Sequence, residues 1–224
     1  MYRQNDGGIY EIQIGNWPKN RFEASVFFSG SGERVIDIGC GNGLVLFSLQ
    51  NKYSSLYGID VSSKRCQDAQ RNLAPCNAEI LCADIEEGLP MYADNYFDTI
   101  ISSDTIEHFV DIFDAISVMA RVLKPNGRLV INTPNFAKIK NRCKLLVGEF
   151  GSTSTNNEGF GNNCEEEMHD GGHLHYFTFS MLDKLCSKYN FHKVEHYGFG
   201  PFGKFHNIIP SLLSPSCQIV AYKK

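Results

Sequence analysis

The sequence lacks the features that mark several protein classes. It contains no uninterrupted apolar stretch of roughly eighteen residues, the length that a membrane-spanning helix needs. Its first twenty residues hold no apolar segment of the signal-peptide type. The eight cysteines are scattered singly, without a Cys-x-x-Cys pair, and give no sign of a disulfide framework. We therefore expect a cytoplasmic protein with no stable membrane insertion.

Positive charge is also scarce. The chain has 21 Lys and Arg against 25 Asp and Glu, a formal net charge of -4 and a pI of about 6.0. Proteins that mainly neutralise phosphates usually carry a basic excess, so no nucleic-acid partner is expected. Lys and Arg are missing altogether between Lys144 and Lys184. Residues 148–172, rich in Gly, Ser, Thr and Asn, lie in this gap and are typical of a long insertion.

Apolar runs and amphipathic stretches alternate from residue 34 onward. With 224 residues and 42% hydrophobic composition, the chain suits one domain. The alternation predicts an α/β fold in which helices cover both faces of a mostly parallel sheet. The expected strands are 34–38, 56–60, 79–83, 97–102, 127–133, 191–198 and 217–222, and the expected helices are 43–52, 62–73, 111–123 and one with Ser180 as its N-cap.

The stretch RVIDIGCGNGLVLFSL is the most informative one. An apolar strand leads into Gly39, Gly41 and Gly43, and a helix follows. Glycines at such a turn let the backbone approach a ligand closely, and the first amides of the following helix can donate hydrogen bonds to it. The dinucleotide fingerprint G-x-G-x-x-G differs, because the third glycine here comes one position early.

Three carboxylates accompany this turn. Asp37 precedes the glycines, Asp60 ends the next expected strand, and Asp84 follows the third strand. Each of them alone could be an ordinary helix cap. Because the carboxyl ends of parallel strands meet at one edge of a sheet, we expect all three to line one crevice. Asp60 would there accept hydrogen bonds from a ribose diol.

Together these motifs resemble the class I S-adenosylmethionine-dependent methyltransferases over roughly residues 20–224. DIGCGNG is similar to their first motif and GIDVS to their second. CADIEEGLPMYADNYFDTIISSDTIEHF is similar to their third and fourth strands, and VLKPNGRLVINTPN to the fifth. The resemblance implies a Rossmann-like three-layer sandwich, with a mostly parallel seven-stranded sheet and an antiparallel last strand. It also implies S-adenosyl-L-methionine as the cofactor.

The resemblance assigns roles to residues by their position. Gly39, Gly41 and Gly43 would line the methionine and ribose portions of the cofactor. Asp37 would help to hold the amino group, and Asp60 would bind the ribose hydroxyls. The adenine and sulfonium ends would be lined by Val61, Asp84, Ile85, Ser102, Ser103 and the Glu107–His108 pair.

Arg21 lies in a segment that would close over the cofactor. The resemblance implies that it pairs with the methionine carboxylate through a bidentate contact. A solvated arginine on a helix surface is the alternative.

The class of methyl acceptor is inferred first from the motifs that the chain lacks. Enzymes of this fold that act on amide or exocyclic nitrogens usually carry an Asn/Asp-Pro-Pro-aromatic turn after the fourth strand, where this chain has Ser102-Ser103-Asp104-Thr105. The only Pro-Cys pair, Pro75-Cys76, lies far from the place where a cytosine-modifying nucleophile would be needed. The tail from His173 resembles the ubiquinone-type O-methyltransferases, which implies a small-molecule acceptor and an oxygen as its methylated atom. The alternatives are a non-catalytic or regulatory S-adenosylmethionine-binding protein and an NAD-dependent oxidoreductase.

Histidines provide the candidates for a general base. The stretch MHDGGHLHYFT contains His173 and His175, which strand-like alternation would point the same way. With His108, they are the expected catalytic residues, since an imidazole titrates near neutral pH. Structural or solvated histidines are one alternative and a metal site is another; no metal is expected, because the carboxylate–histidine spacing is irregular.

The segment after the fifth strand adds a separate feature. In residues 136–147, apolar side chains share one helical face and basic ones occupy the rest. This pattern allows contact with a membrane surface, and a lid helix with a solvated basic face is the alternative. We expect a single methyltransferase domain over 1–224, with 1–30 as an arm that covers the cofactor and 136–178 as an insertion or lid on the acceptor side. The oligomeric state is not predicted.

Overall fold

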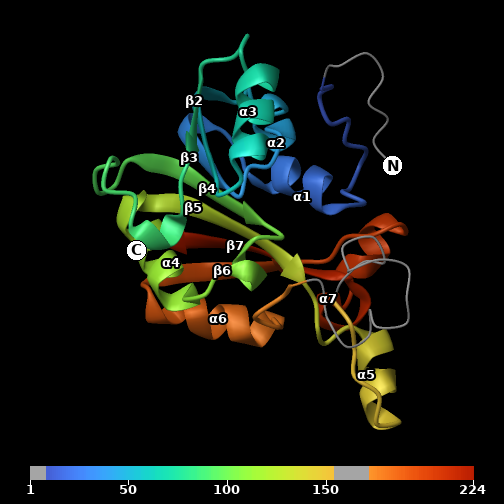
Figure 1. Ribbon diagram of the computed structural model, residues 1–224. Coiled ribbons are helices and arrows are strands. Elements are labelled where there is room, and N and C mark those ends of the chain that lie inside the picture. Colours follow the sequence, from blue (N-terminus) through green and yellow to red (C-terminus); the bar gives the residue numbers. More distant parts are fainter. Residues whose placement is uncertain (1–8, 154–171) are drawn as a thin grey trace.

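The computed structural model describes residues 9–153 and 172–224 (Figure 1). Its centre is a seven-stranded sheet with the order β3-β2-β1-β4-β5-β7-β6. Neighbouring strands from β3 to β5 are parallel, and β7 is antiparallel to both β5 and β6, so the predicted fold class is confirmed. The strands are β1 (Gly32–Ile38), β2 (Tyr53–Asp60), β3 (Ala78–Cys82), β4 (Phe97–Ser103), β5 (Leu123–Pro134), β6 (Phe191–Tyr197) and β7 (Ser216–Lys223).

Helices cover both faces of this sheet (Figure 1). α1, α2 and α3 pack on one face, and α4 and α6 pack on the other. Among the helices in the described ranges, none combines the length and the apolar character needed to cross a membrane. The helices are α1 (Arg21–Phe28), α2 (Leu44–Phe47), α3 (Ser63–Asn72), α4 (Ile112–Val122), α5 (Ile139–Leu146), α6 (Phe179–Lys188) and α7 (Pro210–Leu213), with short 3-10 helices η1 (Ile85–Glu87), η2 (Ile106–His108) and η4 (Gly203–Asn207).

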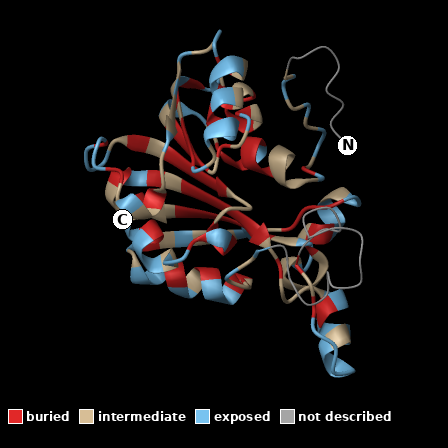
Figure 2. Ribbon diagram, in the orientation of Figure 1, coloured by how far each residue is buried: buried red, intermediate tan, exposed pale blue. Residues whose placement is uncertain are grey.

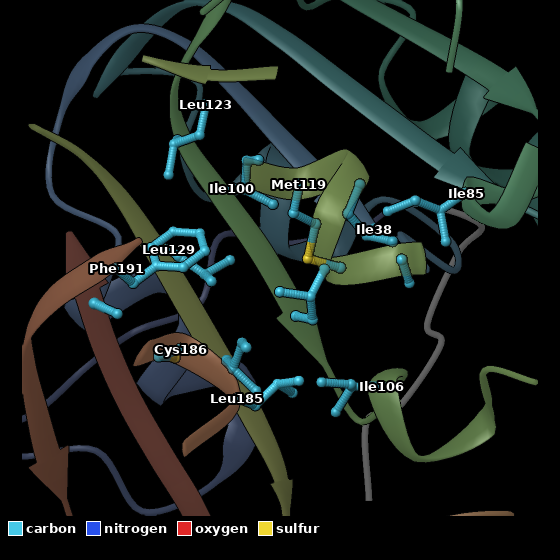
Figure 3. Packing of buried hydrophobic residues seen from close by; sticks show 14 of the residues in the cluster. Ile38, Ile85, Ile100, Ile106, Met119, Leu123, Leu129, Leu185, Cys186 and Phe191 are labelled. Carbon is cyan, nitrogen blue, oxygen red and sulfur yellow. The ribbon is translucent and has the colours of Figure 1, made fainter. Parts of the chain in front are cut away.

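The core follows from the alternation of side chains along the strands. Ile100 packs into the cluster beneath α4 and α6, whereas its neighbour Ile101 packs into the cluster beneath α1–α3. Figure 2 shows buried residues along the whole centre of the sheet. Figure 3 shows Ile38, Ile100 and Met119 meeting on the α4 face. Because the central strands are buried on both faces, their sequences are continuous apolar runs.

The topology determines where a ligand can bind. β1 pairs in parallel with β2 on one side and with β4 on the other. The chain moves outward from β1 to β3, then returns across β1 to continue with β4. The carboxyl ends of β1 and β4 therefore flank a switch point, the place where open α/β sheets hold their ligands.

Two local expectations are wrong. The helix expected over 43–52 is only four residues long, because the chain after Phe47 continues as tight turns that lead into β2. Ser180 is not the N-cap of α6: the Thr178 side chain accepts a hydrogen bond from the Met181 amide, and Ser180 already lies inside the helix.

Candidate functional site

The carboxyl ends of the parallel strands open into a cavity of about 1140 Å³. Segments far apart in the sequence line it: α1, the ends of β1, β2 and β4, the turn after β3, and residues that follow β5. Most residues expected to bind the cofactor lie in this lining, namely Arg21, Asp37, Gly39, Gly41, Asp60, Val61, Asp84, Ile85 and Ser103.

Asp60 connects the end of β2 to the glycine turn. One carboxylate oxygen accepts a hydrogen bond from the Gly41 amide, and the other accepts one from the Ser62 amide, both at 2.9 Å. The side chain is buried in the cavity wall. Two backbone donors therefore hold the carboxylate in place, and its position at the end of β2 is the one expected for a ribose-binding acid.

The glycines of the turn differ in what surrounds them. Gly39 has a φ of +76°, and a Cβ there would come within 2.4 Å of the Thr105 hydroxyl. Gly41 has a φ of +57°, and a Cβ there would meet nothing within 4 Å. Both positions require a left-handed backbone, which glycine adopts at little cost. The space beside Gly41 belongs to the cavity, so a ligand can lie directly against this backbone.

Asp37 is a buried carboxyl at the end of β1. Burial and, to a smaller extent, the negative charge of Asp60 together raise its pKa to about 8. A cation placed beside Asp37 would reverse part of this cost by stabilising the carboxylate. The buried acid is therefore suited to a positively charged ligand group such as an amine.

The pKa of Asp37 leads to a prediction about stability. In the unfolded chain the carboxyl loses its proton near its ordinary pKa of 3.8, whereas the folded protein retains it up to about pH 8. The folded state thus binds more protons in this window, and the contribution of Asp37 to the free energy of unfolding falls as pH rises. We expect Asp37→Asn to gain melting temperature over the wild type between pH 5 and pH 8, by about 2–4 °C for each kcal/mol relieved.

Thermal melts of the ligand-free proteins across this pH range measure the effect. Asp94→Asn is the control, because Asp94 lies on the surface beside Arg121. Parallel pH profiles for the wild type and Asp37→Asn would contradict the assignment.

The turn after β3 forms another part of the wall. One Asp84 carboxylate oxygen accepts a hydrogen bond from the Glu86 amide at 3.0 Å and caps η1. Val61, which directly follows β2, lines the cavity and is largely exposed. An apolar side chain open to the cavity, together with a fixed acid in the same lining, suits a flat ring such as adenine.

Three expected site residues lie outside the lining. A Cβ on Gly43 would meet Leu73 at 2.8 Å, so this glycine permits the close packing of α2 on α3. Ser102 is fully buried behind the end of β4. His175 is not among the lining residues; its Nε2 lies 2.9 Å from the carbonyl oxygen of Phe109, which does line the cavity, and therefore donates to it.

The strand-like alternation expected for His173 and His175 is absent. Residues 173–176 have no regular structure, and only Phe177 forms an isolated bridge, with Asn135. The amides of both Leu174 and His175 instead donate to the Glu107 carbonyl oxygen. This irregular backbone gives the two imidazoles different neighbours.

Arg21 makes a contact that the sequence did not indicate. Its guanidinium pairs with the carboxylate of Asp104, at the end of β4. Asp104 has a φ of +48°, which is unusual for a residue with a side chain. The ion pair joins α1 to the cavity wall, and Arg21 itself lines the cavity; its pairing with a cofactor carboxylate stays a prediction.

Glu107 is the most buried acid beside the cavity. One carboxylate oxygen accepts a hydrogen bond from the Thr133 hydroxyl at 2.9 Å, and the other has no partner within the described ranges. Burial and, to a smaller extent, the negative charge of Asp104 together raise the pKa of Glu107 to about 8. A buried acid with an unused oxygen can accept a proton or contact a polar ligand group.

Two histidines stand next to Glu107. The rings of His108 and His173 meet edge to face, with their centroids 4.9 Å apart. Nδ1 of His173 is 2.8 Å from the Thr153 hydroxyl, and Nδ1 of His108 is 3.3 Å from the Gly172 carbonyl oxygen. One ligand atom from each of Glu107, His108 and His173 falls within 4.8 Å of the others, a grouping that could hold a metal ion. The prediction of no metal stays a prediction.

Sequence reasoning missed several residues of the cavity wall. Thr153 lies in the polar stretch after α5, where one threonine is not distinguishable from its neighbours. Lys138 begins the segment leading into α5 and also reaches the lining. Asp104 was recognised only as part of the turn after β4; its left-handed backbone has no signature in the sequence.

Comparison with known proteins adds family information to this geometry. A family model described as a methyltransferase domain matches residues 29–181. The ubiquinone biosynthesis O-methyltransferase of Bradyrhizobium diazoefficiens is 33% identical over 106 residues, which cover 46% of this chain and 41% of the relative. The mitochondrial enzyme of that name from Bos taurus is 28% identical over 131 residues, which cover 53% and 33%. The chain thus spans well under half the length of these curated relatives.

Solved structures share the fold. A SAM-dependent methyltransferase from Archaeoglobus fulgidus matches with a TM-score of 0.61 and 19% identity, covering 88% of each chain. The YcgJ protein of Bacillus subtilis matches with a TM-score of 0.62 and 16% identity, covering 91% of this chain and 98% of that one. At these identities the likeness concerns the arrangement of helices and strands.

Proposed function

This chain belongs to the class I S-adenosylmethionine-dependent methyltransferases, and we propose that it transfers a methyl group to an oxygen atom of a small molecule. The matched domain supplies the family and the cofactor. The curated relatives bear the name of an O-methyltransferase of ubiquinone biosynthesis, which supports an oxygen acceptor. The observation that carries the proposal is the buried Asp60 carboxylate, fixed by two amides beside the open space at Gly41.

The residues in the wall fit S-adenosylmethionine. Asp60 would accept hydrogen bonds from the ribose hydroxyls, and the Gly39–Gly41 backbone would lie against the methionine portion. Asp37, whose pKa is raised by burial, would hold the amino group of the methionine portion. Arg21, which pairs with Asp104, would in addition bind the methionine carboxylate. Val61, Asp84 and Ile85 would enclose the adenine.

The reaction requires alignment above all. The bound cofactor supplies an activated methyl group, and the chain holds acceptor, methyl and sulfur in line. Ser103 and Glu107 lie in the wall at the end of β4 and in η2, and each has a buried oxygen without a partner in the described part of the chain. These oxygens would orient the acceptor next to the methyl group.

An alcohol or enol acceptor must also lose a proton. His173 is the best-supported base, because it lies in the cavity wall and Thr153 holds its Nδ1. Glu107 stands beside it, and its carboxyl oxygen without a partner in the described ranges would accept a hydrogen bond from the imidazolium that forms. His108 would be a second base candidate, and His175 would instead support the loop through Phe109. The segment 136–178 would act as a lid on the acceptor side, and residues 1–30 as a cofactor-covering arm. Residues 154–171 and 1–8 of these segments lie outside the described residues, and both roles stay predictions, as does the cytoplasmic location.

Incubation of the protein with isotopically labelled S-adenosylmethionine and a small-molecule extract tests the proposal. We expect mass spectrometry to find a labelled methyl group in at least one low-molecular-weight compound, together with the homocysteine product of the cofactor. Cofactor binding without any labelled product would favour a non-catalytic or regulatory binding protein. Extraction of a nicotinamide cofactor would favour the oxidoreductase alternative.

A further inference from the structure

Residues 9–20 form a leading segment that contains neither a helix nor a strand, yet it is fastened to the fold (Figure 1). Its last part carries Trp17, the single tryptophan of the chain. The Trp17 indole donates a hydrogen bond from Nε1 to the Gly198 carbonyl oxygen at 2.8 Å, although the two residues are 181 positions apart. Nearer the N-terminus, the Ile12 amide donates to the Ser48 hydroxyl at 2.9 Å. The indole thus ties the leading segment to the far end of the chain, beside β6.

A cluster of aromatic rings receives the Trp17 side chain. The Trp17 ring centroid lies 5.6 Å from that of Phe27 and 5.8 Å from that of Phe28, both in α1. Tyr197, at the end of β6, lies 6.3 Å away by the same measure. The Lys204 ammonium lies 5.5 Å from the Trp17 ring centroid, within the range of a cation–π contact. Because ring pairs of this kind are attractive beyond the area they bury, Trp17 joins α1, β6 and η4 at one point.

The acceptor of the indole hydrogen bond is itself held in place. The Gly198 amide donates to the side-chain oxygen of Asn207 at 2.8 Å. A Cβ on Gly198 would lie 2.0 Å from the His206 carbonyl oxygen, so the backbone packs closely there. The connection between β6 and β7 that starts at Gly198 leads back to Ser216, which lines the cavity. The indole is therefore bound to a closely packed part of the chain that reaches the cavity wall.

Trp17 lies four residues before Arg21, the first residue of α1, which lines the cavity. Trp17 lies outside this lining. Pro18 is buried, and its ring restricts the backbone directly after Trp17. Asn20 caps α1 by accepting a hydrogen bond from the Glu23 amide at 3.0 Å. A short and restricted stretch thus connects the bound indole to the guanidinium in the cavity wall.

We propose that Trp17 is a positioning residue for cofactor binding: its indole anchors the leading segment and thereby holds the Arg21 side chain in the cavity wall. This role rests on the proposed cofactor site and not on the identity of the acceptor. Without the anchor, Arg21 samples positions away from the cavity, and the cofactor must order the segment when it binds. Because coupling between two sites is reciprocal, a bound cofactor in turn stabilises the anchored position of Trp17.

Isothermal titration calorimetry with S-adenosylhomocysteine tests this role. Trp17→Ala should lower the affinity by about tenfold, within the usual range of coupling between sites. Trp17→Phe keeps a ring in the aromatic cluster and loses the hydrogen bond to Gly198, so its affinity should fall only about threefold. Tyr10→Ala is the matched control, because Tyr10 belongs to the same leading segment and is 67% exposed. This variant should bind as the wild type does, and thermal melts verify that all of these variants are folded.

A double-mutant cycle separates positioning from general support of α1. If Trp17 acts through Arg21, Trp17→Ala in an Arg21→Ala background should lower the affinity by less than about twofold. An equal loss in both backgrounds would show that Trp17 supports the helix in another way and would overturn the proposal. Wild-type affinity in both Trp17→Ala and Trp17→Phe would overturn it as well and would leave the proposed function standing. Failure of the wild type to bind S-adenosylhomocysteine would remove both.

Tryptophan fluorescence gives a second measurement, because Trp17 is the only tryptophan and lies outside the cavity lining. Saturation of the wild type with S-adenosylhomocysteine should lower the quenching of Trp17 by acrylamide by about twofold, since the bound cofactor stabilises the anchored position. Arg21→Ala at saturation should show no such decrease. Equal quenching of the wild type with and without the ligand, or the same decrease in Arg21→Ala, would contradict the coupling between Trp17 and Arg21.

Discussion

Replacement of Asp60 with alanine is expected to lower the affinity for S-adenosylhomocysteine by about a hundredfold or more. On the proposed role of Asp60, the change removes the acceptor for the ribose hydroxyls, and hydrogen bonds to a charged group contribute about 1.5–3 kcal/mol each. It also leaves the Gly41 and Ser62 amides without the carboxylate that holds them. The glycine turn would then lose its fixed position against the cofactor. Isothermal titration calorimetry measures the change in affinity.

Two comparisons keep this result specific. Asp60→Asn should recover part of the affinity, because its amide oxygen still accepts a hydrogen bond. Asp94→Ala, at a surface ion pair with Arg121, should bind as the wild type does. Unchanged affinity in a correctly folded Asp60→Ala protein would remove the main support for the cofactor site.

Replacement of His173 with alanine is expected to reduce turnover by about a hundredfold while leaving cofactor affinity within a fewfold of the wild type. His173 lies in the cavity wall, and its ring is held by Thr153 and stands beside Glu107. Loss of the imidazole would leave the acceptor hydroxyl without a proton acceptor, whereas the cofactor portions of the wall would be unaffected. Turnover at saturating cofactor and cofactor affinity, measured separately, distinguish loss of proton transfer from loss of cofactor binding.

His175→Ala is the matched comparison in the same segment. Its Nε2 hydrogen-bonds the Phe109 carbonyl oxygen, so its loss should lower the melting temperature more than the turnover. Metal chelators should leave the wild-type turnover unchanged if His173 acts as a base. Equal activities of the two histidine variants, or loss of turnover on chelation alone, would contradict the role given to His173.

The fold could be predicted because the strands are buried on both sides. Runs such as the one around Ile100 and Ile101 are continuous and apolar, since alternate side chains enter two different cores. The convergence of Asp37, Asp60 and Asp84 followed from the same inference, because parallel strands end at one edge. These features depend on local patterns that repeat along the chain.

The remaining features depend on contacts between distant residues. The packing of Gly43 against Leu73 and the pairing of Arg21 with Asp104 join elements that are separated in the sequence. Residues 173–176 carry a strand-like pattern, yet they form no strand, because the Leu174 and His175 amides bond to Glu107 instead of a neighbouring strand. Tertiary contacts thus decided which histidine lies in the cavity wall.

The path of the methyl group tests the central claim most directly. In magnetic resonance spectra recorded with S-adenosylmethionine labelled at its methyl carbon, the account predicts that the label leaves the sulfonium and appears as a methoxy group of a low-molecular-weight product. At the same cofactor concentration, Asp60→Ala should strongly reduce the transfer. A label that stays on the bound cofactor with every acceptor fraction, or that appears on nitrogen or in a macromolecule, would contradict the account.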